Sequence, residues 1–141
     1  MAETPEQTME NPSLLSHASL GTNDFERATR FYDAVLPSLG ARRVADYDGM
    51  AAWGRTSPEF WVQRPFDGKA AAVGNGTHIA FLAHSRAEVD AFYAAAVAAG
   101  GVDDGPPGPR SEYSQAYYGC FIRDPDGHKI EAMFWDEAAT G

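Results

Sequence analysis

The chain has 141 residues, of which 44% are hydrophobic and 22% are charged, a composition typical of a soluble globular domain. Twenty acidic side chains against 11 basic ones give a net charge of -9. This balance argues against nucleic-acid binding, which needs a basic stripe, and no apolar run reaches the roughly 18 residues of a membrane span. The single cysteine, Cys120, allows no intramolecular disulfide and favours a reducing, cytoplasmic location.

The two halves of the chain resemble each other at a constant offset of 61 residues. His17 falls on His78, and the pair Phe31-Tyr32 falls on Phe92-Tyr93. We therefore expect one domain, 13–137, built from two modules, 14–65 and 77–136. Residues 1–12 are acidic and polar without the apolar segment of a signal peptide, so we expect a loose N-terminal tail there, and a short C-terminal tail over 138–141.

The first half reads as a strand, a helix and three further strands. The helix is expected to begin at Asn23 or Asp24, to carry an apolar stripe at three-to-four spacing and to stop at Gly40. The predicted strands cover 14–20, 42–47, 50–55 and 60–64. A linker over 66–76 leads into the second half.

The second half repeats this order. Its helix is expected to begin after Ser85, which forms a capping box with Glu88, and to stop at Gly100-Gly101. The stretch 105–109 is rich in proline and glycine and is expected to be a loop. The predicted strands cover 77–83, 102–104, 117–123 and 129–135, so each half has the order βαβββ.

A four-stranded sheet with one helix covers only one of its faces, so the other face needs a pocket or a second sheet. We therefore expect an α+β fold in which two βαβββ modules form a cup-shaped, partly open mixed sheet with the helices outside. Because side chains alternate between faces along a strand, His17, His78 and Glu131 are predicted to face into the cup. These three polar residues break an otherwise apolar pattern.

Three motifs resemble the vicinal oxygen chelate superfamily, which includes lactoylglutathione lyase, bleomycin-resistance proteins and extradiol dioxygenases. They are the segments HASLG at 17–21, DFERATRFY at 24–32 and DPDGHKIE at 124–131. The resemblance implies a divalent metal, with Fe, Mn, Ni and Zn all compatible, held by His17, His78 and Glu131. It also implies a catalytic role for Glu131 and a homodimer, since small members of the superfamily commonly pair modules across chains.

One position departs from the metal-dependent lyases of that superfamily, which add a carboxylate from the last strand of the first module. Trp61 stands where Glu131 stands in the second module, and tryptophan cannot bind a metal. A register slip of two residues would instead turn Gln63 or Glu59 inward. The three-ligand set is closer to the dioxygenases, so lyase or isomerase chemistry and ring-cleaving oxygenation both stay open.

Further residues are predicted to contact a small-molecule substrate. Tryptophans offer a pocket floor, tyrosines after the proline-rich stretch offer hydroxyl donors, and arginines match a carboxylate. His128, beside the DPDG turn, is expected to be exposed, and Cys120 is expected in the core. The substrate-binding candidates are Trp61, Gln63, Arg64, Tyr113, Tyr118 and Trp135, with Tyr117 and Arg110 as further members of the same groups.

Two functions are compatible with these residues. The first is a metal-dependent enzyme that acts on a small oxygen-chelating substrate. The second is a metal-free binding or resistance protein of the bleomycin-resistance type, which would sequester a small aromatic or cationic compound in the same cup.

Overall fold

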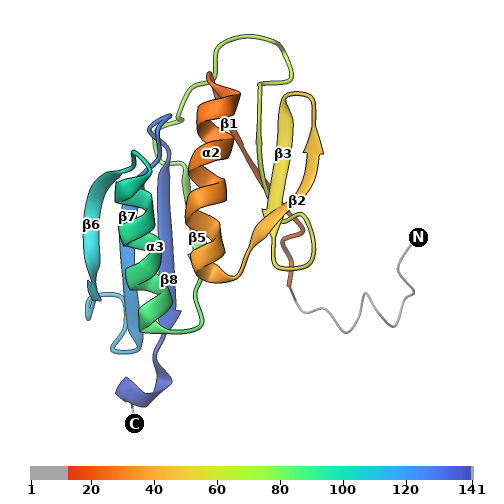
Figure 1. Cartoon of the computed structure of the whole chain (residues 1–141). Coiled ribbons are helices and arrows are strands. Elements are labelled where there is room, and N and C mark those ends of the chain that lie inside the picture. The colour runs from red at the N-terminus through yellow and green to blue at the C-terminus, as the bar shows by residue number, and fades with distance from the viewer. Residues whose placement is uncertain (1–12, 141) are drawn as a thin grey trace.

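The computed structural model describes residues 13–140, and in it two βαβββ modules lie side by side (Figure 1). The N-terminal tail predicted for residues 1–12 lies outside the described residues. Each module contributes one four-stranded sheet, and the two sheets do not close into a barrel. The predicted α+β fold of two open modules is therefore confirmed.

The first module follows the predicted order of elements. Its helix begins where the Asp24 side chain accepts a hydrogen bond from the backbone N–H of Arg27, at 3.1 Å, and the following 3₁₀ turn stops at Gly40, whose φ of 76° suits glycine. The strand order is β1-β4-β3-β2, with β1 and β4 parallel. Its elements are β1 (Ala18–Gly21), α2 (Phe25–Val35), η1 (Leu36–Leu39), β2 (Arg42–Tyr47), β3 (Met50–Gly54) and β4 (Phe60–Gln63).

The second module repeats this topology with strand order β5-β8-β7-β6. The predicted capping contact is present, because the Ser85 hydroxyl accepts a hydrogen bond from the backbone N–H of Glu88 at 3.1 Å. Its elements are β5 (His78–Leu82), α3 (Arg86–Ala98), β6 (Val102–Pro109), β7 (Tyr117–Arg123) and β8 (Lys129–Trp135). A 3₁₀ helix, η2 (Glu137–Thr140), follows where the sequence predicted a C-terminal tail.

Strand β6 corrects the loop predicted for 105–109. The strand continues through this stretch to Pro109 and pairs with β7, with register shifts on either side of Gly105. A strand at the edge of a sheet needs backbone N–H groups on one side only, so β6 accommodates prolines that would break a central strand.

One hydrophobic core joins the two modules. Helices α2 and α3 cover the same side of both sheets, as Figure 1 shows. The core includes Phe31 and Val35 from α2, Phe92 from α3 and Ile130 from β8, each no more than 1% exposed. Cys120 is fully buried there, as predicted, and burial raises the pKa of its thiol to about 12.

The DPDG turn after β7 joins the second module to the first. The Tyr32 hydroxyl donates a hydrogen bond to the Asp124 carboxylate at 2.5 Å, and the Thr22 hydroxyl donates one to Asp126 at 2.7 Å. His128 is 3% exposed, and its Nε2 lies 2.7 Å from the carbonyl oxygen of Gly21. The expectation that His128 is exposed was therefore wrong, because the turn is packed against the other module.

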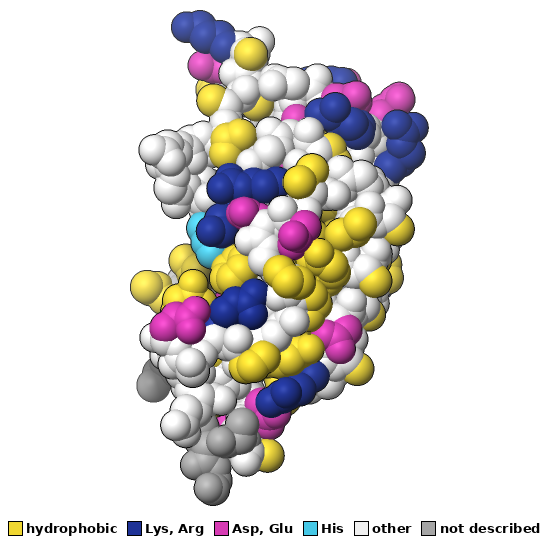
Figure 2. Space-filling view, turned by 90° about the vertical axis from the view of Figure 1, so that its left-hand side faces the viewer, with side chains coloured by type: hydrophobic (Ala, Val, Ile, Leu, Met, Phe, Trp, Pro, Cys, Tyr) yellow, Lys and Arg dark blue, Asp and Glu magenta, His cyan; other side chains and the backbone are white. Residues whose placement is uncertain are grey.

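The sheet faces opposite the helices stay open. They carry partly exposed apolar side chains, among them Met50 from β3, Leu82 from β5 and Trp135 from β8. Figure 2, which views the molecule from the side of β6, shows hydrophobic and charged side chains mixed on that surface. Neither helix of the described chain is long and apolar enough to cross a membrane.

Candidate functional site

The strand registers identify which positions of the two modules are equivalent. In the first module Ser19 pairs with Trp61 across β1 and β4, and in the second Ala80 pairs with Glu131 across β5 and β8. Trp61 therefore occupies the place of Glu131, as the sequence predicted. The first module offers no carboxylate at this position.

The second module brings two of the three predicted metal ligands together. His78 stands at the start of β5, and its Nε2 lies 2.7 Å from Oε1 of Glu131 on the neighbouring strand. Glu131 is only 8% exposed, so its carboxylate needs partners in the protein to offset the loss of water. The imidazole supplies one of them and remains partly open to solvent.

Tyr117 supplies the second partner of Glu131. Its hydroxyl donates a hydrogen bond of 2.6 Å to Oε2, the oxygen that His78 does not contact. To reach that oxygen the ring lies across Gly119, where an added Cβ would stand 2.3 Å from the tyrosine hydroxyl oxygen. Burial first, and then the Glu131 carboxylate, raise the pKa of Tyr117 well above its ordinary value, so the hydroxyl remains a proton donor.

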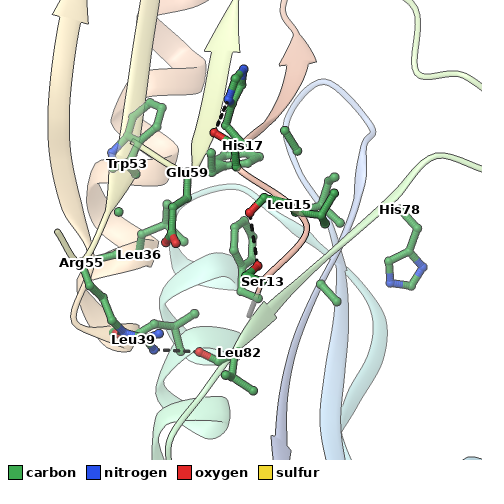
Figure 3. Close-up of a pocket in the computed structure, with 18 residues that line it drawn as sticks. Ser13, Leu15, His17, Leu36, Leu39, Trp53, Arg55, Glu59, His78 and Leu82 are labelled. Carbon is green, nitrogen blue, oxygen red and sulfur yellow. Dashed lines mark hydrogen bonds between the residues drawn. The ribbon is translucent and has the colours of Figure 1, made fainter. Parts of the chain in front are cut away.

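The third predicted ligand, His17, lies on the first module and not beside this pair. Its Nδ1 is 3.0 Å from the Ser16 hydroxyl, and its ring meets the Trp61 ring edge-on at a centroid distance of 6.5 Å. His17 lies just before β1 and His78 at the start of β5, and Figure 3 shows their imidazoles pointing apart. Across residues 13–140, no three His, Cys, Asp or Glu side chains lie close enough together to hold an ion.

A cavity of about 580 Å³ lies between the two modules, among β1, β5 and η1. Its wall is mostly apolar, with Leu36, Phe60 and Phe81 among the lining residues. His17 and His78 also border it, but in Figure 3 the imidazole of His78 points away from the cavity. Glu131 is not among the residues that line this cavity.

The donor atoms of the second module suit a divalent metal. An imidazole nitrogen and a carboxylate oxygen 2.7 Å apart are close enough for one ion to contact both, and this mixture of ligands is common for Zn, Fe, Mn and Ni. The Tyr117 hydrogen bond fixes the other carboxylate oxygen, as outer partners of metal ligands generally do. Two donors fit, and a third has to come from elsewhere.

Four of the predicted substrate contacts lie on the open faces. Tyr113 and Trp135 each meet the Tyr117 ring edge-on, at centroid distances of 5.0 and 6.1 Å, so both lie beside the tyrosine that is bonded to Glu131. Trp61 and Gln63 lie on the open face of the first module, where the Tyr47 ring stacks on Trp61 at 6.4 Å.

The other two predicted contacts, Tyr118 and Arg64, face the helices. Tyr118 follows Tyr117 along β7, so it points to the opposite face and donates a hydrogen bond to Asp90 of α3 at 2.7 Å. Arg64 lies against the ring of Phe25 at the start of α2. Neither side chain reaches the pair of His78 and Glu131.

Sequence reasoning missed two neighbours of this pair, Phe121 and Lys129. Phe121 stands opposite Glu131 on β7, and its ring meets that of His78 at 5.8 Å. Lys129 stands beside His78 in the register and two residues before Glu131 on the same strand. The alternation that placed Glu131 inward applies to Lys129 as well, and was the available signal.

Comparison with known proteins identifies the family to which this chain belongs. Residues 14–132 match the model of the Glyoxalase/Bleomycin resistance protein/Dioxygenase superfamily. The chain belongs to this superfamily. The superfamily resemblance drawn from the three motifs is thus confirmed, while the match leaves the particular activity open.

Solved structures agree with this assignment. A glyoxalase/bleomycin resistance protein from Albidiferax ferrireducens T118 is 36% identical, with a TM-score of 0.79 over 86% of this chain and 98% of that one. A glyoxalase-related enzyme from Fulvimarina pelagi is 21% identical, with a TM-score of 0.66 over 88% of each chain. The fosfomycin resistance protein FosX from Mesorhizobium loti is 24% identical, with a TM-score of 0.60 over 85% of this chain and 90% of that one. The curated proteins contained no significant match.

Proposed function

We propose that the protein is a divalent-metal-dependent enzyme acting on a small oxygen-chelating substrate, with each site shared between two copies of the chain. His78 and Glu131 of one copy and His17 of the other would hold the ion. The observation that carries this proposal is the pair itself, in which a buried carboxylate is held by Tyr117 on one oxygen and faces the partly exposed imidazole of His78 on the other.

A homodimer would supply the missing donor. Each chain carries both parts of the site, because His17 lies on one open sheet face and His78 with Glu131 on the other. A two-fold axis that sets the first module of one copy against the second module of the other would make two identical sites. It would also cover the exposed apolar side chains of both faces, which favours the assembly by removing them from water.

The protein side chains divide the work at such a site. When bound, the metal would act as a Lewis acid toward neighbouring oxygens of the substrate. Glu131 would hold the ion through Oε1. The Tyr117 hydroxyl donates a hydrogen bond to Oε2 and so fixes the orientation of the carboxylate. Two imidazoles and one carboxylate leave positions open for a chelating substrate, which suits lyase or isomerase chemistry and ring-cleaving oxygenation alike.

Metal content combined with subunit mixing tests the proposal. The wild-type protein, purified without a chelating tag, should hold about one ion per chain, and His17→Ala, His78→Ala and Glu131→Ala should each lose it. Mixing the His17→Ala and Glu131→Ala chains should restore about one quarter of the sites, since half of the random dimers then contain one intact site. Oxygen consumption with a catechol would separate the oxygenase from the lyase.

The matched control is His84→Ala, because His84 is an exposed histidine before α3 and stands apart from the site. Its metal content should equal that of the wild type. The shared site would be contradicted if the His17→Ala chain kept its ion, or if mixing the two variants restored nothing while both remained dimeric.

The aromatic rings of the open faces favour a second candidate, a metal-free protein that binds a flat or cationic compound. Two groups of rings could bind such a ligand. One is Tyr47 stacked on Trp61, and the other is Tyr117 with Tyr113 and Trp135 each in contact with it. Absence of metal after reconstitution, together with tight binding of an aromatic cation, would favour this candidate over the enzyme.

A further inference from the structure

We propose that Arg110, supported by Lys129, forms an oxyanion subsite beside Glu131, so that the substrate carries a carboxylate or phosphate group. This inference rests on the proposed function, because it describes one end of the molecule bound at the same site. It also gives a role to the residues at 105–109, which were expected to form a loop and which lead into Arg110.

The guanidinium of Arg110 is oriented by the backbone of β6. Its Nη2 donates a hydrogen bond of 2.7 Å to the carbonyl oxygen of Pro106, and its Nη1 donates one of 3.3 Å to that of Pro109. A Cβ at Gly108 would lie 3.1 Å from Nη1, and one at Gly105 would lie 3.4 Å from Nη2. The glycines thus leave room for the guanidinium, and the carbonyl groups hold its plane.

The position of this guanidinium points toward the candidate site. It lies over the ring of Phe121, at 5.8 Å, and Phe121 is the residue opposite Glu131 on the neighbouring strand. Its charge also acts on the pKa of Tyr117, which it lowers against the larger effects of burial and Glu131. Arg110 therefore lies on the same face as Tyr117 and Glu131.

Lys129 adds a second positive charge beside Phe121. Its Nζ lies 5.0 Å from the centre of that ring. The ring carries both cations on its surface, an arrangement that aromatic faces favour.

The carboxylates around Phe121 do not pair with Arg110, so its guanidinium can bind an anionic group of the substrate. Asp104 is already shared between Arg123, at 3.0 Å, and Lys129, at 4.0 Å. Among the described residues no carboxylate forms an ion pair with Arg110, although the chain carries a net charge of -9. A half-buried guanidinium with free N–H donors matches the two oxygens of a carboxylate or phosphate.

Titration of the metal-free wild-type protein with inorganic phosphate and with acetate, at constant ionic strength in chloride, tests the subsite. Saturable binding of either anion supports it, and the preference between them identifies the substrate group. Arg110→Gln should weaken that binding at least about tenfold, the value of a hydrogen-bonded charge pair. Arg110→Lys, which keeps the charge and loses the planar fork, should weaken it less, and Lys129→Gln should weaken it by about threefold.

Arg42→Gln is the matched control, because Arg42 is an exposed arginine on β2, the edge strand of the first module. It should change anion binding by less than about twofold. The inference is overturned if neither anion binds saturably, or if Arg42→Gln and Arg110→Gln weaken binding equally while both proteins give the wild-type circular dichroism spectrum.

Glu131→Gln separates this inference from the proposed function. That variant should lose metal while it binds the anion at least as tightly as the wild type, since a negative charge beside the subsite is removed. Loss of anion binding by Arg110→Gln in a protein that never takes up metal would support the subsite and refute the metal enzyme. Metal uptake without any anion binding would support the metal enzyme and refute the subsite.

Discussion

The two modules share one topology and differ in the chemistry of their open faces. His17 is equivalent to His78, and Trp61 is equivalent to Glu131. In the first module His17 and Trp61 make an aromatic contact, whereas in the second His78 and Glu131 make a hydrogen bond between an imidazole and a carboxylate. Duplication therefore preserved the positions and changed what they carry. One module carries an imidazole and a carboxylate in contact, and the other carries a single histidine beside an aromatic ring.

Substitutions at Gly119 and Met50 should differ most in their effect on the free energy of unfolding. The two positions are equivalent, since Gly119 stands opposite Met133 and Met50 opposite Gln63. Gly119→Ala places a methyl group 2.3 Å from the Tyr117 hydroxyl oxygen, which forces the ring off Glu131. We expect a loss of about 3 kcal/mol in the free energy of unfolding, from overpacking and a broken hydrogen bond, measured by urea denaturation.

Met50→Ala is the control for this change. Its side chain is 37% exposed, so the loss should stay below about 1 kcal/mol. Equal losses for Gly119→Ala and Met50→Ala would show that the path of Tyr117 across Gly119 does not constrain the fold.

Tyr32 and Tyr93 are equivalent positions on the two helices, and removing their hydroxyl groups should change the free energy of unfolding by different, smaller amounts. Tyr32 is fully buried and bonded to Asp124, so Tyr32→Phe should cost about 2 kcal/mol in unfolding free energy. Tyr93 lies nearer the surface beside Asp103, and Tyr93→Phe should cost markedly less. If the two changes cost the same, the link through the DPDG turn adds nothing to stability.

The same tyrosine gives the protein an alkaline limit. Burial, and then the Asp124 carboxylate, raise the pKa of Tyr32 well above 10.0 in the folded chain. Its contribution to stability is complete below pH 10 and declines as the pH rises further, because only the unfolded chain then releases the proton. Tyr32→Phe should therefore flatten the alkaline part of the stability profile, by up to about 1.4 kcal/mol per pH unit.

The smallest effects should come from the helix caps, where the modules are alike. Asp24 and Ser85 each accept a backbone N–H of the first turn. Asp24→Ala and Ser85→Ala should each cost about 1 kcal/mol, measured by thermal or urea unfolding. A difference between them larger than the measurement error would mean that the two helix starts are not energetically equivalent.

Local pattern predicted most of the fold. Strands 42–47, 117–123 and 129–135 have the expected bounds, because turn signals stand close to their ends. The strand predicted over 102–104 is present, but its continuation over 105–109 was missed. Prolines there are tolerated only at a sheet edge, and which strand becomes an edge depends on the whole sheet.

The candidate site was harder to predict than the fold. The pair of His78 and Glu131 follows from alternation within neighbouring strands of one module, which sequence periodicity reveals. The separation of His17 depends on how the modules lie relative to each other, and no local pattern encodes that. Alternation from Tyr117 also indicates that Tyr118 faces α3, where the structure has it.

The link between the modules also has a consequence for how sequences of this kind diverge. His128 meets Gly21 at the carbonyl oxygen, and every residue type supplies that atom. A substitution at position 21 would therefore call for no matching substitution at position 128. The two halves can remain joined at this point through long stretches of evolution while pairwise covariation between the two positions stays silent.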